Sequence, residues 1–440
     1  MLRRFLPFLL LFALFPACAA AQPALKRALG RAIAGAGPAS GAYVIDGTTH
    51  KAIFSWRPDT PRTLASNTKI FTSAAALGFN GATSTLATDL LGNGSLQPDG
   101  TWQGDLYLRG GGDPTFGGRS FAQRFFGSDA SVDALAAQLE QAGFTSVTGS
   151  VFGDESLFDS VRGTAYSGFG VSTDIGGPLS ALDFDRGLAN SSGSAFQAKP
   201  PQFAAARLRA VLESDGIHVT GKPKAGAAPA GSVVLAEARS PDFARLLQLQ
   251  NKESDNLFAE LLLKGLPVDS AAGGPLRAAD APLPSTPTPA APGTAQQAAD
   301  PTLVGTTRSG ARAAVGFARS LGVRVTLVDG SGLDRADRAS PRQLATLLDR
   351  LRAGPDFQAF YSSLPIAGRD GTLKDRMRSG PARGHCHAKT GTLTGVSALS
   401  GYCSTRGGRT VVFSILMNGV NVFGARAIQD RMTQAIAGSH

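Results

Sequence analysis

The two ends of this 440-residue chain carry hydrophobic patterns that are typical of β-strands and amphipathic helices. Near the C-terminus the pattern predicts strands at 388–393, 396–403 and 410–417, followed by a helix at 422–437. Near the N-terminus it predicts strands at 42–46 and 52–56 and a helix at 64–77, with Thr63 or Ser66 as N-cap. We expect the two ends to build one sheet with helices packed on it.

The intervening residues show a second set of strand and helix patterns. Strands are predicted at 104–108, 147–152 and 217–220, helices at 132–141 and 203–212, and helical periodicity again over 241–264. Together, the strand and helix patterns of the ends and of the intervening residues predict an α/β (α+β) protein. Residues 22–88 and 245–440 would form one split domain, interrupted by an inserted α+β domain at 89–244. Residues 271–300 are mostly Ala, Pro, Gly, Thr and Ser without an aromatic side chain, so we expect a flexible loop there.

Residues 1–21 have the pattern of a signal peptide. Two arginines precede an apolar run over 5–15 that is too short to span a bilayer as a helix, and Ala19 and Ala21 offer a cleavage point. The paired arginines leave a twin-arginine export route open, and Cys18 leaves a lipoprotein signal open. We therefore expect export to the periplasm.

The chain is basic, with a formal net charge of +10, which becomes about +8 without the two arginines of the signal peptide. Basic proteins suit polyanions, but no run of Lys and Arg with interleaved aromatic residues points to nucleic acid. We expect peripheral association with an anionic cell-wall polymer or membrane surface. The alternative is that the high net charge reflects only drift in amino-acid composition and no anionic partner.

Cys386 and Cys403 are the cysteines that would remain after export to an oxidising compartment. A two-residue turn at 394–395 would place them opposite each other in an antiparallel hairpin, which predicts a cross-strand disulfide. A metal site made with His385 and His387 is the alternative. Strand alternation disfavours it, because the histidines would lie on the face opposite the thiol.

Three short motifs occur once each and in a fixed order. They are Ser66-Asn67-Thr68-Lys69, Ser254-Asp255-Asn256 and Lys389-Thr390-Gly391, the last followed by Thr392. A single Ser-x-x-Lys match is weak, because Ser66 could serve only as an N-cap and Lys69 could be solvated. All three, on a helix, a helix-connecting loop and a strand, are typical of penicillin-recognising serine enzymes.

The chemistry of acyl transfer explains these residue types. A serine hydroxyl such as Ser66 needs a nearby base, and burial together with the second cation Lys389 would favour the neutral form of Lys69. Ser254 can pass a proton toward the lysines, and Asn256 can hold a substrate amide. The backbone N–H groups of Ser66 and Thr392 are candidate donors to the oxyanion. The strand segment beside Lys389, which comprises Thr390, Gly391 and Thr392, is a candidate site for the substrate carboxylate.

The chain resembles the low-molecular-mass, class C penicillin-binding proteins, the D-Ala-D-Ala carboxypeptidase/endopeptidase family. The resemblance also rests on 106–114, 329–333, 364–368 and 370–373. It implies a transpeptidase-like, β-lactamase-like domain with an antiparallel sheet, flanking helices and a helical subdomain. It further implies peptidoglycan stem peptides as substrates, β-lactams as inhibitors and no cofactor or metal. A unit nested in the inserted domain is usual in the family, and we expect it to be reduced or absent here.

Two alternatives to a DD-peptidase remain. A β-lactamase shares the motif types, but the class A enzymes need a Glu-positioned water, and the sequence has no Glu-x-x-Leu-Asn. A catalytically silent peptidoglycan-binding protein would retain the fold without acylation. The sequence does not decide the balance between carboxypeptidase and endopeptidase activity.

Overall fold

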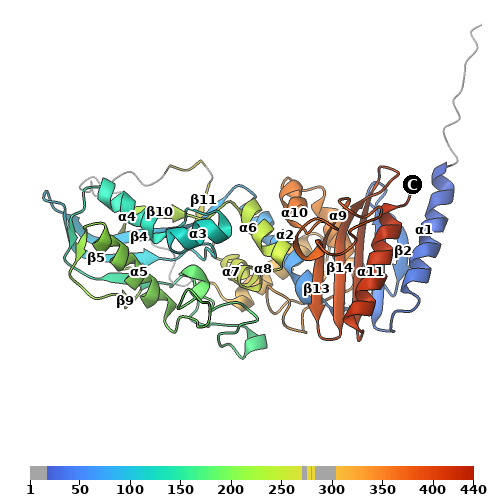
Figure 1. The fold of residues 1–440 in the computed structure, drawn as a ribbon, viewed down its shortest axis with the longest axis horizontal. Helices are drawn as coiled ribbons and strands as arrows, with labels where there is room; N and C mark the ends of the chain where they lie inside the picture. The colour runs from blue at the N-terminus through green and yellow to red at the C-terminus, as the bar shows by residue number, and fades with distance from the viewer. Residues whose placement is uncertain (1–16, 270–274, 279, 283–303) are drawn as a thin grey trace, which may run out of the picture.

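The computed structural model describes residues 17–269, 275–278, 280–282 and 304–440. The molecule is elongated, with one β-sheet in each half and a group of helices between them (Figure 1). Helix α1 (Ala17–Ile33) packs beside the last helix, α11 (Val422–Ala437), at one end. Most of the predicted signal peptide at 1–21 lies outside the described residues, so it stays a prediction.

The first sheet is antiparallel and unites the two ends of the chain. Its strand order is β13 (Cys386–Leu393), β14 (Val396–Ser404), β15 (Thr410–Asn418), β1 (Ser40–Asp46) and β2 (Ala52–Trp56). β1 pairs with β15 from Ser40 opposite Met417 to Asp46 opposite Val411. The N-terminal hairpin therefore extends the C-terminal meander, as the hydrophobic pattern predicts.

Both faces of this sheet are covered, so successive side chains enter different hydrophobic cores. Val44 and Phe413 belong to the core beneath α1 and α11, whereas Val412 and Leu416 belong to the core on the opposite face. That second core is closed by α9 (Pro341–Leu351) and α10 (Phe357–Ser363). Burial on both faces makes the sheet a rigid support for any residue it carries.

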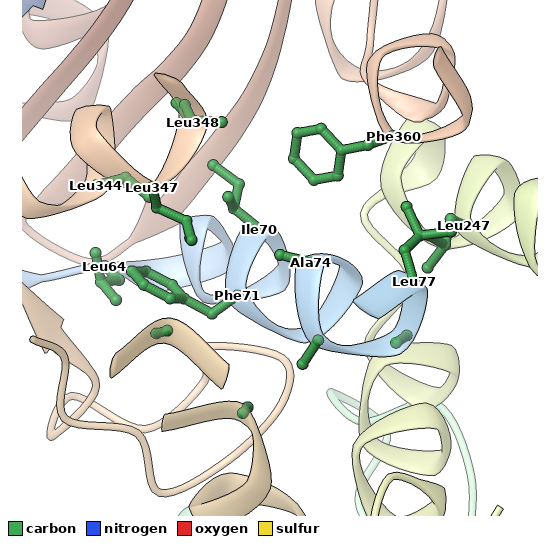
Figure 2. Packing of buried hydrophobic residues seen from close by; sticks show 14 of the residues in the cluster. Leu64, Ile70, Phe71, Ala74, Leu77, Leu247, Leu344, Leu347, Leu348 and Phe360 are labelled. Atoms are coloured by element: carbon green, nitrogen blue, oxygen red, sulfur yellow. The ribbon is translucent and has the colours of Figure 1, made fainter. Parts of the chain in front are cut away.

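Helix α2 (Thr68–Asn80) runs through the second core and is buried along most of its length. Figure 2 shows Ile70 and Phe71 of α2 beside leucines of α9, and Leu77 near Leu247 of the neighbouring α6 (Phe243–Glu253). The leucines of α9 are Leu344, Leu347 and Leu348. This packing fixes the position of the first turn of α2, which follows Ser66 directly.

The second sheet has its own hydrophobic core. Its order is β10 (Val233–Arg239), β4 (Thr85–Leu96), β5 (Thr101–Arg109), β6 (Ser146–Val147) and β8 (His218–Val219), with β7 (Val151–Asp154) on β5 and β9 (Lys224–Ala225) on β7. The helices of this half are α3 (Arg119–Phe126), α4 (Val132–Gln141) and α5 (Pro200–Ser214). β4 crosses the predicted domain boundary at residue 89, and the division into domains stays a prediction.

The strand predicted at 147–152 is wrong as a single element. The structure has two short strands there, β6 and β7, and both run parallel to β5. Between them the backbone N–H of Ser150 donates to the side chain of Asp105, at 2.7 Å from its Oδ1. A side-chain acceptor takes the place of a ladder partner at this point and divides the strand.

The helical stretch predicted at 241–264 is two helices, α6 (Phe243–Glu253) and α7 (Asn256–Gly265). Ser254 has a φ of 61°, a left-handed conformation that cannot continue a helix. Asp255 then caps α7 by accepting the N–H of Phe258. The break places Ser254 and Asn256 at a junction between helices.

The predicted flexible loop at 271–300 is wrong at Leu276 and Arg277. These two residues form β11 and pair with β4. Arg277 contacts the carboxylates of Asp89 and Glu237, at N–O distances of 3.0 and 2.6 Å. Pairing with a preformed strand and two ion pairs order a segment that lacks a core of its own. Most of the remaining loop lies outside the described residues, and the chain continues into α8 (Thr307–Ser320).

Cys386 and Cys403 face each other across β13 and β14 and form the predicted disulfide. The metal alternative fails because the thiol is consumed, and the ring of His387 stacks on Tyr361 instead.

Elsewhere, β3 (Arg62–Thr63) pairs with β12 (Arg338–Ala339). Within the described part of the chain, no helix combines the length and apolar character needed to cross a membrane.

Candidate active site

Ser66 lies in a single 3₁₀ turn, Ala65–Asn67, that leads directly into α2. The expectation that Thr63 or Ser66 caps a helix beginning at residue 64 is wrong, since Asn67 holds the N-cap position of α2 without a side-chain capping bond. Ala65 has a φ of 47°, which is unfavourable for a residue with a Cβ. The turn and the buried α2 behind it leave the Ser66 hydroxyl free to meet other side chains.

Lys69 is fully buried and its amine has three hydrogen-bond acceptors. Its Nζ lies 3.1 Å from Ser66 Oγ, 2.6 Å from Asn256 Oδ1 and 2.7 Å from the carbonyl oxygen of Ser331. The first two acceptors belong to two of the predicted motifs. The third belongs to a loop outside the three motifs, and it completes the orientation of the amine.

Lys389 brings the third motif to the same place. It is fully buried in β13, and its Nζ donates to Ser254 Oγ at 2.8 Å and to the Thr390 carbonyl at 3.0 Å. The side chain of Asn67 donates to the Lys389 carbonyl at 3.0 Å, which ties the Ser66 turn to β13. The structure therefore brings together Ser66, Lys69, Ser254, Asn256 and Lys389 from three separate segments.

Gly391 is required by the close approach of β13 to the Ser66 turn. A Cβ at this position would lie 2.7 Å from the Leu64 carbonyl and 3.1 Å from the backbone nitrogen of Ser66. Thr390 and Thr392 flank it on the exposed edge of the strand. The hydroxyl of Thr390 hydrogen-bonds with that of Thr372 at 2.8 Å, and the hydroxyl of Thr392 accepts from Arg426 at 3.1 Å. Hydroxyl groups and a guanidinium thus line the strand where a carboxylate is expected.

Burial controls the protonation of the two lysines. It lowers the pKa of Lys69 from 10.5 to about 8, against the opposing effect of four carboxyl groups. Those groups belong to Asp329, Glu260, Asp255 and Asp337. Burial, followed by the charge of Lys69, lowers the pKa of Lys389 well below its usual range. A neutral amine is therefore accessible near neutral pH, as a general base requires.

Several residues of this site were absent from the sequence prediction. Ser331 supplies the carbonyl that faces Lys69, and Glu260 supports the loop that carries it. Asp255 pairs with Arg186 at 2.7 Å, and the amide of Asn256 also donates to the Asp174 carbonyl at 2.6 Å. The stretch at 329–333 was visible as a family-like segment, but its contact with Lys69 depends on folding.

Comparison with known proteins decides the family. The D-Ala-D-Ala carboxypeptidase 3 (S13) family matches residues 28–191, 188–280 and 298–438. The chain belongs to this family. A D-alanyl-D-alanine carboxypeptidase of Actinomadura sp. (strain R39) is 28% identical over 91% of this chain and 81% of that protein. A carboxypeptidase of Mycobacterium tuberculosis is 28% identical over 95% of this chain and 82% of that protein.

The fold is also that of a solved structure, penicillin binding protein 4 from Haemophilus influenzae. The TM-score is 0.70 at 21% identity, and the match covers 92% of this chain and 97% of the other. Membership of the S13 family confirms the predicted fold class and the predicted activity, a serine-type D-Ala-D-Ala carboxypeptidase and/or DD-endopeptidase.

Proposed function

We propose that this S13-family enzyme hydrolyses the terminal D-Ala-D-Ala bond of peptidoglycan stem peptides through an acyl-enzyme on Ser66. Lys69 removes the proton of the Ser66 hydroxyl as its oxygen attacks the carbonyl carbon of the penultimate D-Ala. The proton taken up by Lys69 then passes by way of Lys389 and Ser254 to the leaving D-Ala nitrogen, and the peptide C–N bond breaks, so that Lys69 is neutral again. Water then attacks the ester, giving its proton back through Lys69, and the shortened stem leaves as a carboxylate.

The backbone N–H groups of Ser66 and Thr392 would bind the oxyanion that forms in each step. The proposal is supported by the close approach of Gly391 to the Ser66 turn, which keeps β13 against the nucleophile. Lys389, Thr390 and Thr392 would hold the terminal carboxylate of the substrate, and the side chain of Asn256 would hold a stem amide. Gly391 contributes by the absence of a side chain.

The observation that carries the proposal is the 3.1 Å contact between the Lys69 amine and the Ser66 hydroxyl inside a buried cluster that also holds Lys389 and Ser254. The test is to incubate the purified protein with a fluorescent penicillin and to locate the adduct by mass spectrometry. We expect one adduct per chain, on Ser66, and none in Ser66→Ala. Labelling of Ser66→Ala at the wild-type level would refute the assignment.

The balance between trimming and cross-link cleavage needs a separate experiment. Purified sacculi would be digested, and released D-Ala and monomeric stems followed by chromatography. Release of D-Ala alone identifies a carboxypeptidase, and conversion of cross-linked dimers to monomers identifies an endopeptidase. The β-lactamase alternative is tested with nitrocefin, for which we expect one slow acylation per site rather than sustained turnover.

We further propose that the protein is exported to the periplasm and associates peripherally with an anionic envelope surface. The second part is supported by a hollow of about 460 Å³ whose lining includes Arg378, Arg383, His385 and Arg406. Among the residues that the structure describes, no acidic side chain lines it and none of the three arginines forms an ion pair. Guanidinium groups suit phosphate recognition.

The association is tested by sedimentation with phosphatidylglycerol vesicles and with phosphatidylcholine vesicles as the control. We expect binding to the anionic vesicles only, and reduced binding when Arg378, Arg383 and Arg406 are changed together to Gln. Equal binding by the triple variant would overturn the assignment of this hollow. Cell fractionation with an N-terminal deletion of residues 2–21 tests export.

A further inference from the structure

Glu260 is a buried carboxyl that none of the three motifs includes. It lies on α7, one turn after Asn256, and its side chain is fully buried. Its Oε1 accepts the backbone N–H of Gly330 at 3.1 Å and that of Ser331 at 2.8 Å, and its Oε2 lies 3.1 Å from the Gly330 nitrogen. A carboxyl acceptor shared by two adjacent N–H groups fixes the peptide plane between them.

That peptide plane adjoins the carbonyl group that faces Lys69. The Ser331 carbonyl oxygen lies 2.7 Å from Lys69 Nζ, on the same amine that contacts Ser66 Oγ. The loop has little room to adjust elsewhere, because a Cβ at Gly330 would meet the Ala259 carbonyl at 2.5 Å and a Cβ at Gly332 would meet the Ala65 carbonyl at 2.0 Å. The orientation of the Lys69 amine therefore depends on a loop clamped between α7 and the Ser66 turn.

We propose that Glu260 is a positioning residue for the DD-peptidase reaction, which by holding the N–H groups of Gly330 and Ser331 aims the Ser331 carbonyl, and through it the Lys69 amine, at the Ser66 hydroxyl. The inference rests on the proposed role of Lys69 as base. Glu260 does not touch substrate in this scheme. Its contribution passes through the loop and through its charge.

Other titratable groups also surround the Lys69 amine and bear on its titration. They are Asp329 and Asp337 from the loop before α9, Asp255 at the start of α7 and Lys389 on β13. Asp329 accepts the N–H groups of Gly332 and Asp334, and Asp337 accepts the N–H of Val328 and the O–H of Thr68, so both support the same loop. Glu260 alone among them binds the N–H of Ser331.

The test is the pH dependence of acylation by a penicillin, expressed per site that can be acylated. The wild-type rate should rise with pH as Lys69 becomes neutral and reach a plateau. In Glu260→Ala the plateau should fall at least tenfold because the amine is no longer aimed at Ser66. The pH of half-maximal rate should also fall. Burial, followed by the charge of Asp329, raises the pKa of Glu260 to about 8, so this carboxyl becomes negative over the pH range in which Lys69 titrates, and its removal favours the neutral amine.

Glu260→Gln separates the two effects, since it keeps an oxygen acceptor for the loop but cannot ionise. We expect its plateau to stay within threefold of wild type while its half-maximal pH falls. Asp269→Ala is the matched control, because Asp269 is a buried carboxyl shortly after the end of α7 that accepts from Asn80 at 2.8 Å. It should lower stability and leave the half-maximal pH unchanged.

Each outcome decides the question. A lower plateau in Glu260→Ala with an unchanged half-maximal pH would assign a purely structural role and overturn the inference, as would wild-type behaviour of this variant. If Glu260→Ala does not fold, the half-maximal pH of Glu260→Gln decides alone: a fall supports the inference and an unchanged value overturns it. Failure of the wild-type protein to acylate would instead refute the proposed function.

Discussion

The two sides of the candidate site treat their lysines differently. On the α2 side, Lys69 has three hydrogen-bond acceptors, and four carboxyl groups oppose the effect of burial on its pKa. On the β13 side, Lys389 is equally buried, but the charge that acts on it is that of Lys69, which lowers its pKa further. A proton shared between the two is therefore stabilised on the α2 side in the free enzyme.

Because the two lysines differ in their neighbouring charges, substrate binding at Lys389 can make Lys69 a better base. A substrate carboxylate beside Lys389 favours the charged form of that lysine, and a charged Lys389 in turn favours a neutral Lys69. Binding of the substrate carboxylate at Lys389 would thus increase the fraction of Lys69 that is neutral and able to act as base.

The largest effect is expected for Lys69→Met, which removes the base and keeps an unbranched side chain in the buried site. Acylation should fall by about 10³-fold, within the range for loss of a general base. The measurement is the second-order rate constant for a fluorescent penicillin. A decrease of less than tenfold would mean that another group takes the Ser66 proton, and the comparison between the two lysines would fail.

Lys389→Met should reduce kcat/KM by about 10²-fold for a peptide ending in D-Ala-D-Ala carboxylate, because it removes a charge-assisted contact to the carboxylate. For the same peptide with an amidated C-terminus, the loss should be only about tenfold, because the contribution of Lys389 to proton delivery is then the only one removed. Equal losses on both peptides would show that Lys389 acts on the chemistry alone and not on carboxylate binding.

Gly391→Ala tests the contact that holds the two sides together. Its Cβ would lie 2.7 Å from the Leu64 carbonyl, so β13 or the Ser66 turn must shift. We expect about tenfold slower acylation and a free energy of unfolding lower by about 1–3 kcal/mol. Gly316→Ala on α8 is the control, since nothing lies within 4 Å of its added Cβ. This control should leave acylation unchanged.

The smallest effect on activity is expected for the double variant Cys386→Ala, Cys403→Ala. The disulfide closes a loop with a sequence separation of 17 at the end of β13 that precedes the Lys-Thr-Gly motif. Its removal should lower the free energy of unfolding by about 2–4 kcal/mol. Acylation at a temperature well below the transition should change less than twofold. A tenfold loss would show that the disulfide also positions Lys389.

Local pattern was sufficient for much of this protein. The helix at 422–437 and the helix at 132–141 have the predicted bounds, because each has a continuous apolar face. The hairpin register followed from one two-residue turn, which placed Cys386 opposite Cys403. Ser66, Lys69, Ser254, Asn256 and Lys389 were candidates from their motifs alone, because acyl transfer restricts which side chains can serve.

Tertiary structure decided what local pattern could not. Ser254 ends a helix although its neighbours are periodic, and Leu276 and Arg277 form a strand although their neighbours in sequence favour a loop, since distant partners outweigh local preference. The contact of Ser331 with Lys69 and the support from Glu260 join residues far apart in the chain. Sequence determined which groups could react, whereas burial and long-range contacts determined which of them is oriented and what charge it carries.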